Sequence, residues 1–285
     1  MGSYSTSPEP EILPPGSEGP PPPPPAPRRR SRWAAAPATY LLLGINCGVF
    51  VLMVAQGASI WVPTLDQLMR WGADRTSNVL IYSEWWRIVT AMFVHVGLIH
   101  LATNMWCLWN LGLLAEPLMG SAGLMAAYVL TGAAGNLLST LVNWWRFHGD
   151  WIRFHDPTVF PAGAGASGAV FGIAGALIVL LKSRRLPVPP REVSRLRRSV
   201  IYFAAINLVI GFSVNFGSGL TGVAVDNSAH VGGCLCGLLL AAPMVPRIGS
   251  PRSEFDLRLR LSVAMVMLLL VLFGFFVAHL TPPQG

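Results

Sequence analysis

The stretch from Gly163 to Leu181 reads GAGASGAVFGIAGALIVLL, and it carries the features that decide the fold. From Ser167 onward it is apolar or small and holds no charge, over roughly 16 residues, whereas a helix needs about 20 to cross a hydrocarbon core. Such a helix is expected to begin inside the bilayer. Backbone that enters a bilayer non-helically must be sheltered by protein or line a water-filled cavity. The segment therefore indicates a recessed, hydrated site in a membrane protein.

The composition of the whole chain agrees with this class. Of 285 residues 53% are apolar, only 12% are charged and 10 are Trp, a residue enriched at membrane interfaces. Six other apolar stretches accompany Ser167 to Leu181, namely Tyr40 to Trp61, Ala91 to Leu114, Gly123 to Trp145, Val200 to Phe216, His230 to Val245 and Leu261 to Leu280. The sequence therefore predicts an all-α polytopic membrane protein with seven transmembrane helices.

The first 32 residues differ from the rest. They hold the proline run Pro20 to Pro25, many Ser and Gly, and four arginines at their end. Such a segment cannot bury enough apolar area to fold, and it lacks the apolar centre of a signal peptide. We expect residues 1–32 to be a disordered Pro/Arg-rich tail, a solvated linker more than a ligand for an SH3-like partner.

The basic residues predict the orientation, because cytoplasmic loops prefer Lys and Arg. With the tail inside, fifteen of the 20 basic residues lie on the inner side. The outer side then holds Arg70, Arg75, Arg87, Arg146 and Arg153. The N-terminus is therefore expected in the cytoplasm of a multi-pass cell-membrane protein. The net charge of +7 is explained by topology and anionic lipid, without nucleic acid as a partner.

The four cysteines, Cys47, Cys107, Cys234 and Cys236, all fall inside apolar stretches, where free cysteine behaves as a small hydrophobe. Cys234 and Cys236 have no second pair, and no H-E-x-x-H motif is present. We expect no disulfide framework, no metal and no cofactor.

Four polar residues at membrane depth are functional candidates, since such groups are costly there: His100, Asn104, Ser167 and His230. Counted at the helical rise, Ser167, His230 and His100 lie roughly 22 to 25 Å from the charged residue at the inner end of their own stretch. The three are therefore expected at one level. The charged residues at the inner ends of these three stretches are Lys182 after Ser167, Arg247 after His230 and Glu116 after His100.

These side chains have complementary chemistry. A serine hydroxyl becomes a good nucleophile when a neutral histidine takes its proton, which favours Ser167 as nucleophile and His230 as base. The oxyanion that forms on an attacked amide needs positioned donors. The i, i+4 spacing of His100 and Asn104 directs both side chains to one side of their helix, and the Ser167 N–H at a helix start is a further donor.

Small residues predict how the two helices meet. Gly168 and Gly172 form one small face, and Ala229, Gly233 and Gly237 form another on the helix of His230. Small residues spaced by four let membrane helices pack closely. We expect this contact to bring Ser167 and His230 within hydrogen-bond reach.

With these motifs the chain resembles the rhomboid family of intramembrane serine proteases, in its six-plus-one helix variant. The matching residues are Gly165-Ala166-Ser167-Gly168, Ala229-His230 followed by Gly233 and Gly237, His100 with Asn104, and Trp86-Arg87. The resemblance implies a catalytic dyad of Ser167 and His230, oxyanion support from His100 and Asn104, and transmembrane proteins as substrates.

The same resemblance implies an organisation. Residues 33–247 would form the six-helix protease core, and residues 248–285 a cytoplasmic linker and an additional C-terminal transmembrane helix. Trp86-Arg87 would belong to a loop lying partly in the membrane, and the loop near Gly217 to Ser228 would cap a site that opens to the extracytoplasmic side. Phe171 stands where some members have a tyrosine against the catalytic histidine, so stacking is expected there without a hydroxyl contact.

Three alternatives remain open at this stage. Asp226, four residues before His230, would complete a triad if it reached the imidazole. An inactive relative that binds membrane proteins is a second reading, although such relatives typically lack the serine or the histidine. A transporter using the polar groups as a pathway is the third, but the chain has no internal repeat and the groups cluster at one depth. The substrate, cleavage site and oligomeric state are not specified.

Overall fold

The computed structural model describes residues 36–183, 186, 188–221, 225–247 and 251–280, so the predicted tail of residues 1–32 lies outside the described residues. The long helices are α2 (Pro37–Ala55), α6 (Leu98–Phe154), α7 (Ser167–Leu180), α8 (Pro190–Thr221), α9 (Asn227–Ala241) and α10 (Arg252–Ala278). Short elements connect α2 to α6, namely α3 (Leu65–Arg70), β1 (Asp74–Arg75), α4 (Thr76–Leu80), α5 (Arg87–Thr90) and η1 (Ala91–Phe93). The others are η2 (Pro157–Val159), β2 (Ala162–Gly163) and η3 (Ala242–Arg247).

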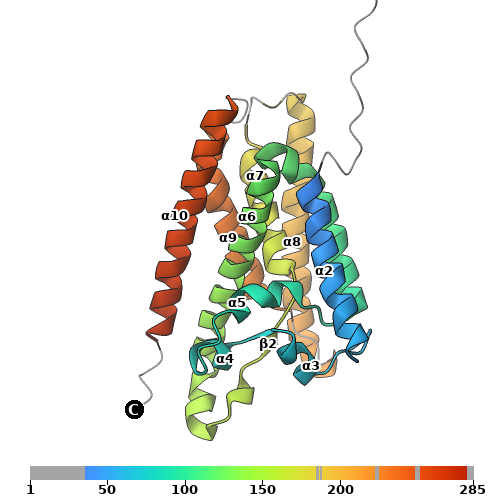
Figure 1. The fold of residues 1–285 in the computed structure, drawn as a ribbon, viewed down its shortest axis with the longest axis vertical. Coiled ribbons are helices and arrows are strands. Elements are labelled where there is room, and N and C mark those ends of the chain that lie inside the picture. The colour runs from blue at the N-terminus through green and yellow to red at the C-terminus, as the bar shows by residue number, and fades with distance from the viewer. Residues whose placement is uncertain (1–35, 184–185, 187, 222–224, 248–250, 281–285) are drawn as a thin grey trace, which may run out of the picture.

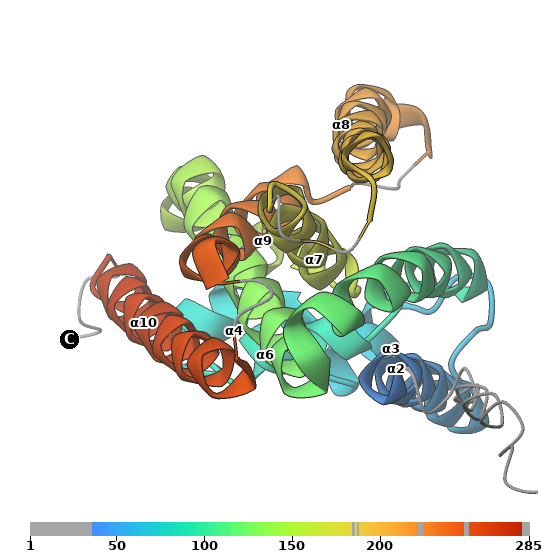
Figure 2. The same ribbon diagram turned by 90° about the horizontal axis from the view of Figure 1, so that it is seen from above.

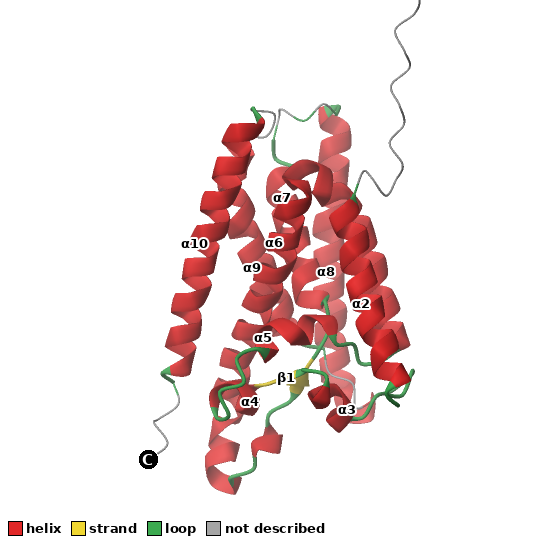
Figure 3. Cartoon of the chain, viewed as in Figure 1, coloured by secondary structure: helices red, strands yellow, loops and turns green. Residues whose placement is uncertain are grey.

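The long helices run side by side as one bundle, and the short elements between α2 and α6 gather at one end of it (Figure 1, Figure 3). Seen along the bundle, α7 and α9 lie near the middle, whereas α10 and α8 lie on different sides of the outside (Figure 2). Almost every residue of α7 is buried, and its main neighbours are α6 and α9. The end with the short elements, here called the site end, is the end at which α7 and α9 begin.

The prediction of an all-α polytopic membrane protein is confirmed. Among the described residues four helical segments are long and apolar enough to cross a membrane: Pro37–Ala55, Leu98–Phe154, Asn227–Val245 and Arg252–Ala278. The longest is two helices joined at Gly120, whose φ of 76° and ψ of 165° are not helical. With α6 divided there, each of the seven predicted stretches contains one helix or helix arm.

Several predicted boundaries are wrong. The second stretch was expected to begin at Ala91, but α6 begins only at Leu98, because Gly97 has a φ of 129° and an added Cβ would lie 2.1 Å from the Trp61 carbonyl oxygen. The third stretch was expected to end at Trp145, but its helix continues to Phe154. Polar residues outside a hydrocarbon core can remain helical, and apolar patterning alone does not detect them.

The helices α8 and α10 also begin earlier than their apolar stretches, at Pro190 and Arg252. The helix α8 continues to Thr221, into the loop that was expected to cap the site. Residues 222–224 of that loop lie outside the described residues.

The predicted contact between the two small faces is present. A Cβ on Gly233 would lie 2.0 Å from the carbonyl oxygen of Gly168, and one on Gly237 would lie 1.9 Å from that of Gly172. A real Cβ cannot occupy either position. The backbones of α7 and α9 are therefore in direct contact over about one helical turn, and only glycine permits it.

Away from the site end, Glu116 ties α2 to α6. Its two carboxylate oxygens accept hydrogen bonds from the backbone N–H groups of Ala38 and Thr39 at 2.9 and 2.8 Å, and also from the hydroxyls of Thr39 and Ser121. Carboxylates are favourable at helix N-termini, where backbone N–H groups lack partners. This buried residue therefore caps a helix far from it in sequence.

The contact between α7 and α9 predicts that Gly233→Ala destabilises the protein by about 3 kcal/mol or more. This cost is at the upper end of the usual range for an overpacked core, because the added methyl group would clash with backbone that cannot rotate away. Gly44→Ala is the matched control, since nothing lies within 4 Å of a Cβ there. The measurement is thermal unfolding of both variants in detergent. Equal unfolding midpoints for the two would contradict the described contact.

Candidate active site

Ser167 is the first residue of α7, and the loop before it is fixed from two sides. The Gly165 N–H donates to the Ala91 carbonyl at 2.9 Å, so the loop is attached to the first residue of η1. Gly165 has a φ of +130°, and an added Cβ would lie 2.5 Å from Cε1 of His100. Only glycine fits between the loop and this imidazole. The structure thus places His100 directly against the loop that carries Ser167.

His230 lies in the first turn of α9 and faces α7. Its ring stacks on that of Phe171, with centroids 4.2 Å apart and an interplanar angle of 7°. Phe171 follows Ser167 by four residues on α7, so the two side chains share one helical face. His230 is buried and Ser167 is half-buried. The imidazole therefore adjoins the face that carries the serine.

Ser167 and His230 were predicted to lie within hydrogen-bond reach, and no hydrogen bond joins them within the described part of the chain. The Ser167 hydroxyl makes no hydrogen bond there, and Nδ1 of His230 is buried without a partner. The structure brings Ser167 and His230 onto adjoining first turns without joining them. Catalytic hydrogen bonds of enzymes without bound substrate are often long and tighten only in the complex.

His100 and Asn104 lie in the first two turns of α6. Asn104 Nδ2 donates to the His100 carbonyl at 2.9 Å, which ties the amide to its own helix and leaves one of its two N–H bonds. The His100 ring also lies beside that of His95, with centroids 5.4 Å apart. The structure thus brings His100 to Gly165 in the loop before Ser167, and Asn104 is buried one helical turn further along α6.

Sequence reasoning missed the role of His95. Nε2 of this fully buried ring accepts a 3.5 Å hydrogen bond from the Ala166 N–H, directly before Ser167. Its Nδ1 lies 3.3 Å from the Phe93 carbonyl oxygen, which fits a neutral ring with the proton on Nδ1. His95 therefore positions the serine loop. The i, i+5 spacing to His100 was the only signal in the sequence.

Asp226 does not complete a triad in this structure. It is the N-cap of α9, where its side chain accepts from the Ala229 N–H at 3.0 Å and from the Ser139 hydroxyl of α6. Since Nδ1 of His230 has no partner among the described residues, the carboxylate is not bonded to the imidazole. Asp226 instead fixes where the helix of His230 begins.

Trp86 and Arg87 belong to the short elements at the site end. The buried Arg87 pairs with Glu84 at 2.6 Å and donates to the carbonyls of Met69 and Ala73 at 2.7 and 2.9 Å. Trp86 is half exposed, and the Arg87 guanidinium lies 4.4 Å from its ring centroid. Arg87 thus holds the connecting segment together and does not reach the serine loop directly.

The comparisons with known proteins agree with this geometry. Residues 82–247, which include Ser167 and His230, match the model of the Rhomboid domain. The chain belongs to the rhomboid family. Rhomboid protease GluP of Bacillus subtilis is 30% identical over 243 residues, which cover 85% of this chain and 40% of that protein.

Two other rhomboid relatives have similar identity. Rhomboid protease AarA of Providencia stuartii is 30% identical over 183 residues, covering 59% of this chain and 62% of its own. RHOMBOID-like protein 6, mitochondrial, of Arabidopsis thaliana is 30% identical over 193 residues, which cover 68% of this chain and 54% of that protein. The chain thus spans between 40% and 62% of the length of these curated relatives.

In this rhomboid no group of three or more His, Cys, Asp or Glu side chains that could hold a metal ion occurs among the described residues. A pair of carboxyls lies beside the site instead. Asp74 on β1 pairs with Gly163 on β2, four residues before Ser167, and it is close to Asp226. Burial raises the pKa of Asp74 to about 7, and the charge of Asp226 adds to this effect.

A protonated Asp74 predicts how the stability of this rhomboid depends on pH. Below about pH 4 both folded and unfolded states hold the proton; between about 4 and 7 only the folded state does, so stability falls as the pH rises. Thermal unfolding midpoints in detergent should therefore fall over this interval, and Asp74→Asn should flatten the fall. The exposed Asp150→Asn is the control. Equal slopes for wild type and Asp74→Asn would contradict the prediction.

Proposed function

We propose that this protein is an intramembrane serine endopeptidase that cleaves transmembrane segments of single-span membrane proteins through a Ser167–His230 dyad. The observation that carries the proposal is the direct backbone contact of α7 and α9, which sets the first turns of both helices against each other. Its relatives GluP and AarA are named as rhomboid proteases, which supports the same activity.

In the proposed reaction the Ser167 Oγ attacks the carbonyl carbon of the scissile peptide bond while His230 takes the hydroxyl proton. The imidazole then gives this proton to the leaving amine as the C–N bond breaks, and an acyl-enzyme remains on Ser167. A water molecule, deprotonated by His230, hydrolyses the acyl-enzyme and restores the hydroxyl. The stacked ring of Phe171 supports this by limiting how His230 can turn.

Three groups are suited to stabilise the oxyanion. The Ser167 N–H lies at the free N-terminus of α7, where backbone donors lack helical partners. His100 lies against Gly165, and Asn104 retains one N–H bond that is not used by the His100 carbonyl. A single donor of this kind is worth about 10²- to 10³-fold in turnover.

The substrate class follows from the chemistry of the site. The amides of a transmembrane helix are hydrogen-bonded and shielded, so a substrate must unwind locally before Ser167 can reach a carbonyl. Small residues before the cleaved bond would favour this opening. Water would reach the site end from the extracytoplasmic side.

The proposed arrangement in the membrane places the N-terminus in the cytoplasm and the site end outside. This orientation rests on the excess of basic residues at the opposite end of the bundle. Residues 33–247 would form the protease core, preceded by the tail of residues 1–32. Residues 248–285 would add a linker and the helix α10.

The dyad predicts that Ser167→Ala and His230→Ala each abolish cleavage of a reporter transmembrane segment, because one variant lacks the nucleophile and the other the base. Initial rates are measured with purified protein in lipid vesicles, so that protein amount is fixed. Both variants should fall by at least 10³-fold, the scale of a lost nucleophile or base.

The matched controls are Ser194→Ala and His148→Ala, which change an exposed serine and an exposed histidine elsewhere in the chain. Both should cleave at the wild-type rate. Persistent cleavage by Ser167→Ala or His230→Ala would remove the dyad. Binding of the segment without cleavage by the wild-type protein would favour an inactive relative instead.

A further inference from the structure

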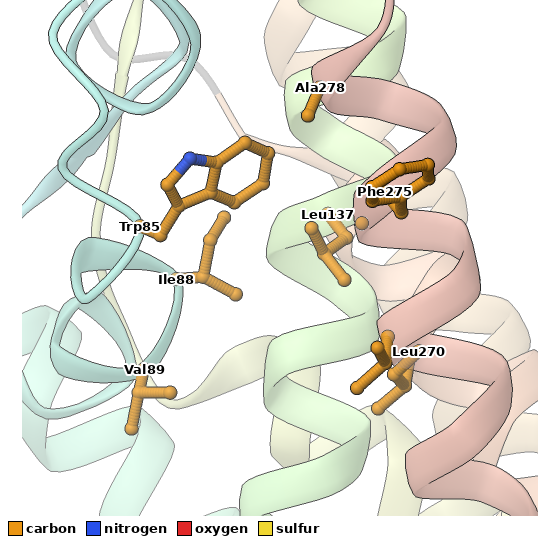
Figure 4. A pocket seen from close by; sticks show the side chains of 9 residues that line it. Trp85, Ile88, Val89, Leu137, Leu270, Phe275 and Ala278 are labelled. Carbon is orange, nitrogen blue, oxygen red and sulfur yellow. The ribbon is translucent and has the colours of Figure 1, made fainter.

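An apolar groove lies outside the candidate active site, between α5 and α10. Its cavity measures about 470 Å³. Figure 4 shows Trp85, Ile88 and Val89 on one wall and Leu270, Phe275 and Ala278 of α10 on the other, with Leu137 of α6 behind them. Every lining residue is apolar apart from the Trp85 ring N–H, and no other segment of the described chain fills the space.

Near its end α10 packs against the bundle through Val277, which is fully buried in one apolar cluster with Ile88 and Leu137, and two hydrogen bonds attach its first half. There the Ser262 hydroxyl donates to the Leu240 carbonyl and Arg258 donates to that of Pro243 at 3.1 Å. Toward its end α10 lies at the edge of the bundle (Figure 1), and Trp85 and Ile88 face it across the groove (Figure 4). Gly274 widens the space, since the nearest atom to an added Cβ is Leu137 Cδ2 at 3.9 Å.

We propose that this groove binds one acyl chain of a bilayer phospholipid. The helix α10 is long and apolar enough to cross a membrane, so lipid is the solvent around the groove. Water is a poor occupant, because a cavity without polar partners stays dry. An acyl chain is the apolar molecule present at the highest concentration.

The size of the groove favours lipid over a transmembrane helix as occupant. A helix with side chains is about 10–12 Å wide, so a single turn already needs roughly 400–600 Å³. A cavity of about 470 Å³ therefore admits about one turn of a helix but a long part of a slender acyl chain. Trp85 at the site end fits the same occupant, since Trp favours the level where lipid tails meet headgroups.

Occupancy would support the wall of the candidate active site. Ile88 and Val89 line the groove, and the Asn136 side chain donates to the Ile88 carbonyl at 2.8 Å. Two residues after Val89, the Ala91 carbonyl accepts from Gly165 in the serine loop. An acyl chain under α5 would thus fill the space behind the segment that holds this loop.

The test uses a phospholipid with a photoreactive diazirine near the end of one acyl chain, crosslinked to the full-length protein in vesicles and mapped by mass spectrometry. Adducts should concentrate on the peptides with Trp85 to Val89 and Leu270 to Ala278. Gly274→Leu should lower these adducts at least tenfold by filling the groove. Gly48→Leu is the matched control, because that glycine on α2 is exposed and has nothing within 4 Å of an added Cβ.

A second readout is the thermal unfolding midpoint in detergent with added phospholipid, which should rise in wild type and in Gly48→Leu but not in Gly274→Leu. If Gly274→Leu fails to fold, Ala278→Phe replaces it at the end of the groove. Adducts spread evenly over the lipid-facing helices, equal adducts in the filled variants, or crosslinks between two protein copies in the groove would each overturn the proposal. Neither readout depends on proteolysis.

Discussion

The site depends on one constraint, the direct contact of the α7 and α9 backbones through Gly168, Gly172, Gly233 and Gly237. Membrane helices have no hydrophobic force pulling them together, so close packing through small residues has to supply the association. Here the contact also fixes the relative position of two side chains. Ser167 directly precedes Gly168, and His230 lies three residues before Gly233, so the same contact sets the distance between nucleophile and base. The ring of Phe171, stacked on that of His230, then limits how far the imidazole can rotate.

The remaining elements at the site end hold the loop before Ser167. Its N–H groups are taken up by the Ala91 carbonyl and by His95, and its Gly165 accommodates the His100 ring. The start of α9 is held in the same way, through the hydrogen bonds of Asp226 to Ala229 and Ser139. A short helix beginning inside a bilayer needs such partners, because unpaired backbone groups are costly there. Both proposed catalytic side chains are thus attached to helix starts that several distant segments fix.

Much of this was predictable from the sequence, because membrane helices follow from length and apolar composition, and close packing follows from small residues four apart. The seven stretches and the contact between the small faces were both predicted and are present. The starts of α6, α8 and α10 were not predicted. Gly97 keeps a non-helical backbone in close contact with Trp61, which no local pattern reveals, and polar residues extend the other two helices at their starts. His95 and the Asp74–Asp226 pair were missed because their roles depend on partners distant in sequence. The sequence predicted Ser167 and His230 within hydrogen-bond reach, and that prediction stays open, because the two side chains share no hydrogen bond in the described part of the chain.

The central claim is that His230 activates Ser167, and the most direct measurement is covalent labelling with a fluorophosphonate, which reacts with activated serines. The adduct is mapped by mass spectrometry and its rate of formation is measured in the purified wild type and in His230→Ala. We expect a single adduct on Ser167, formed about 10²- to 10⁴-fold more slowly without the imidazole, as for a lost general base. An adduct on another serine, or labelling of Ser167 at an unchanged rate in His230→Ala, would contradict the account.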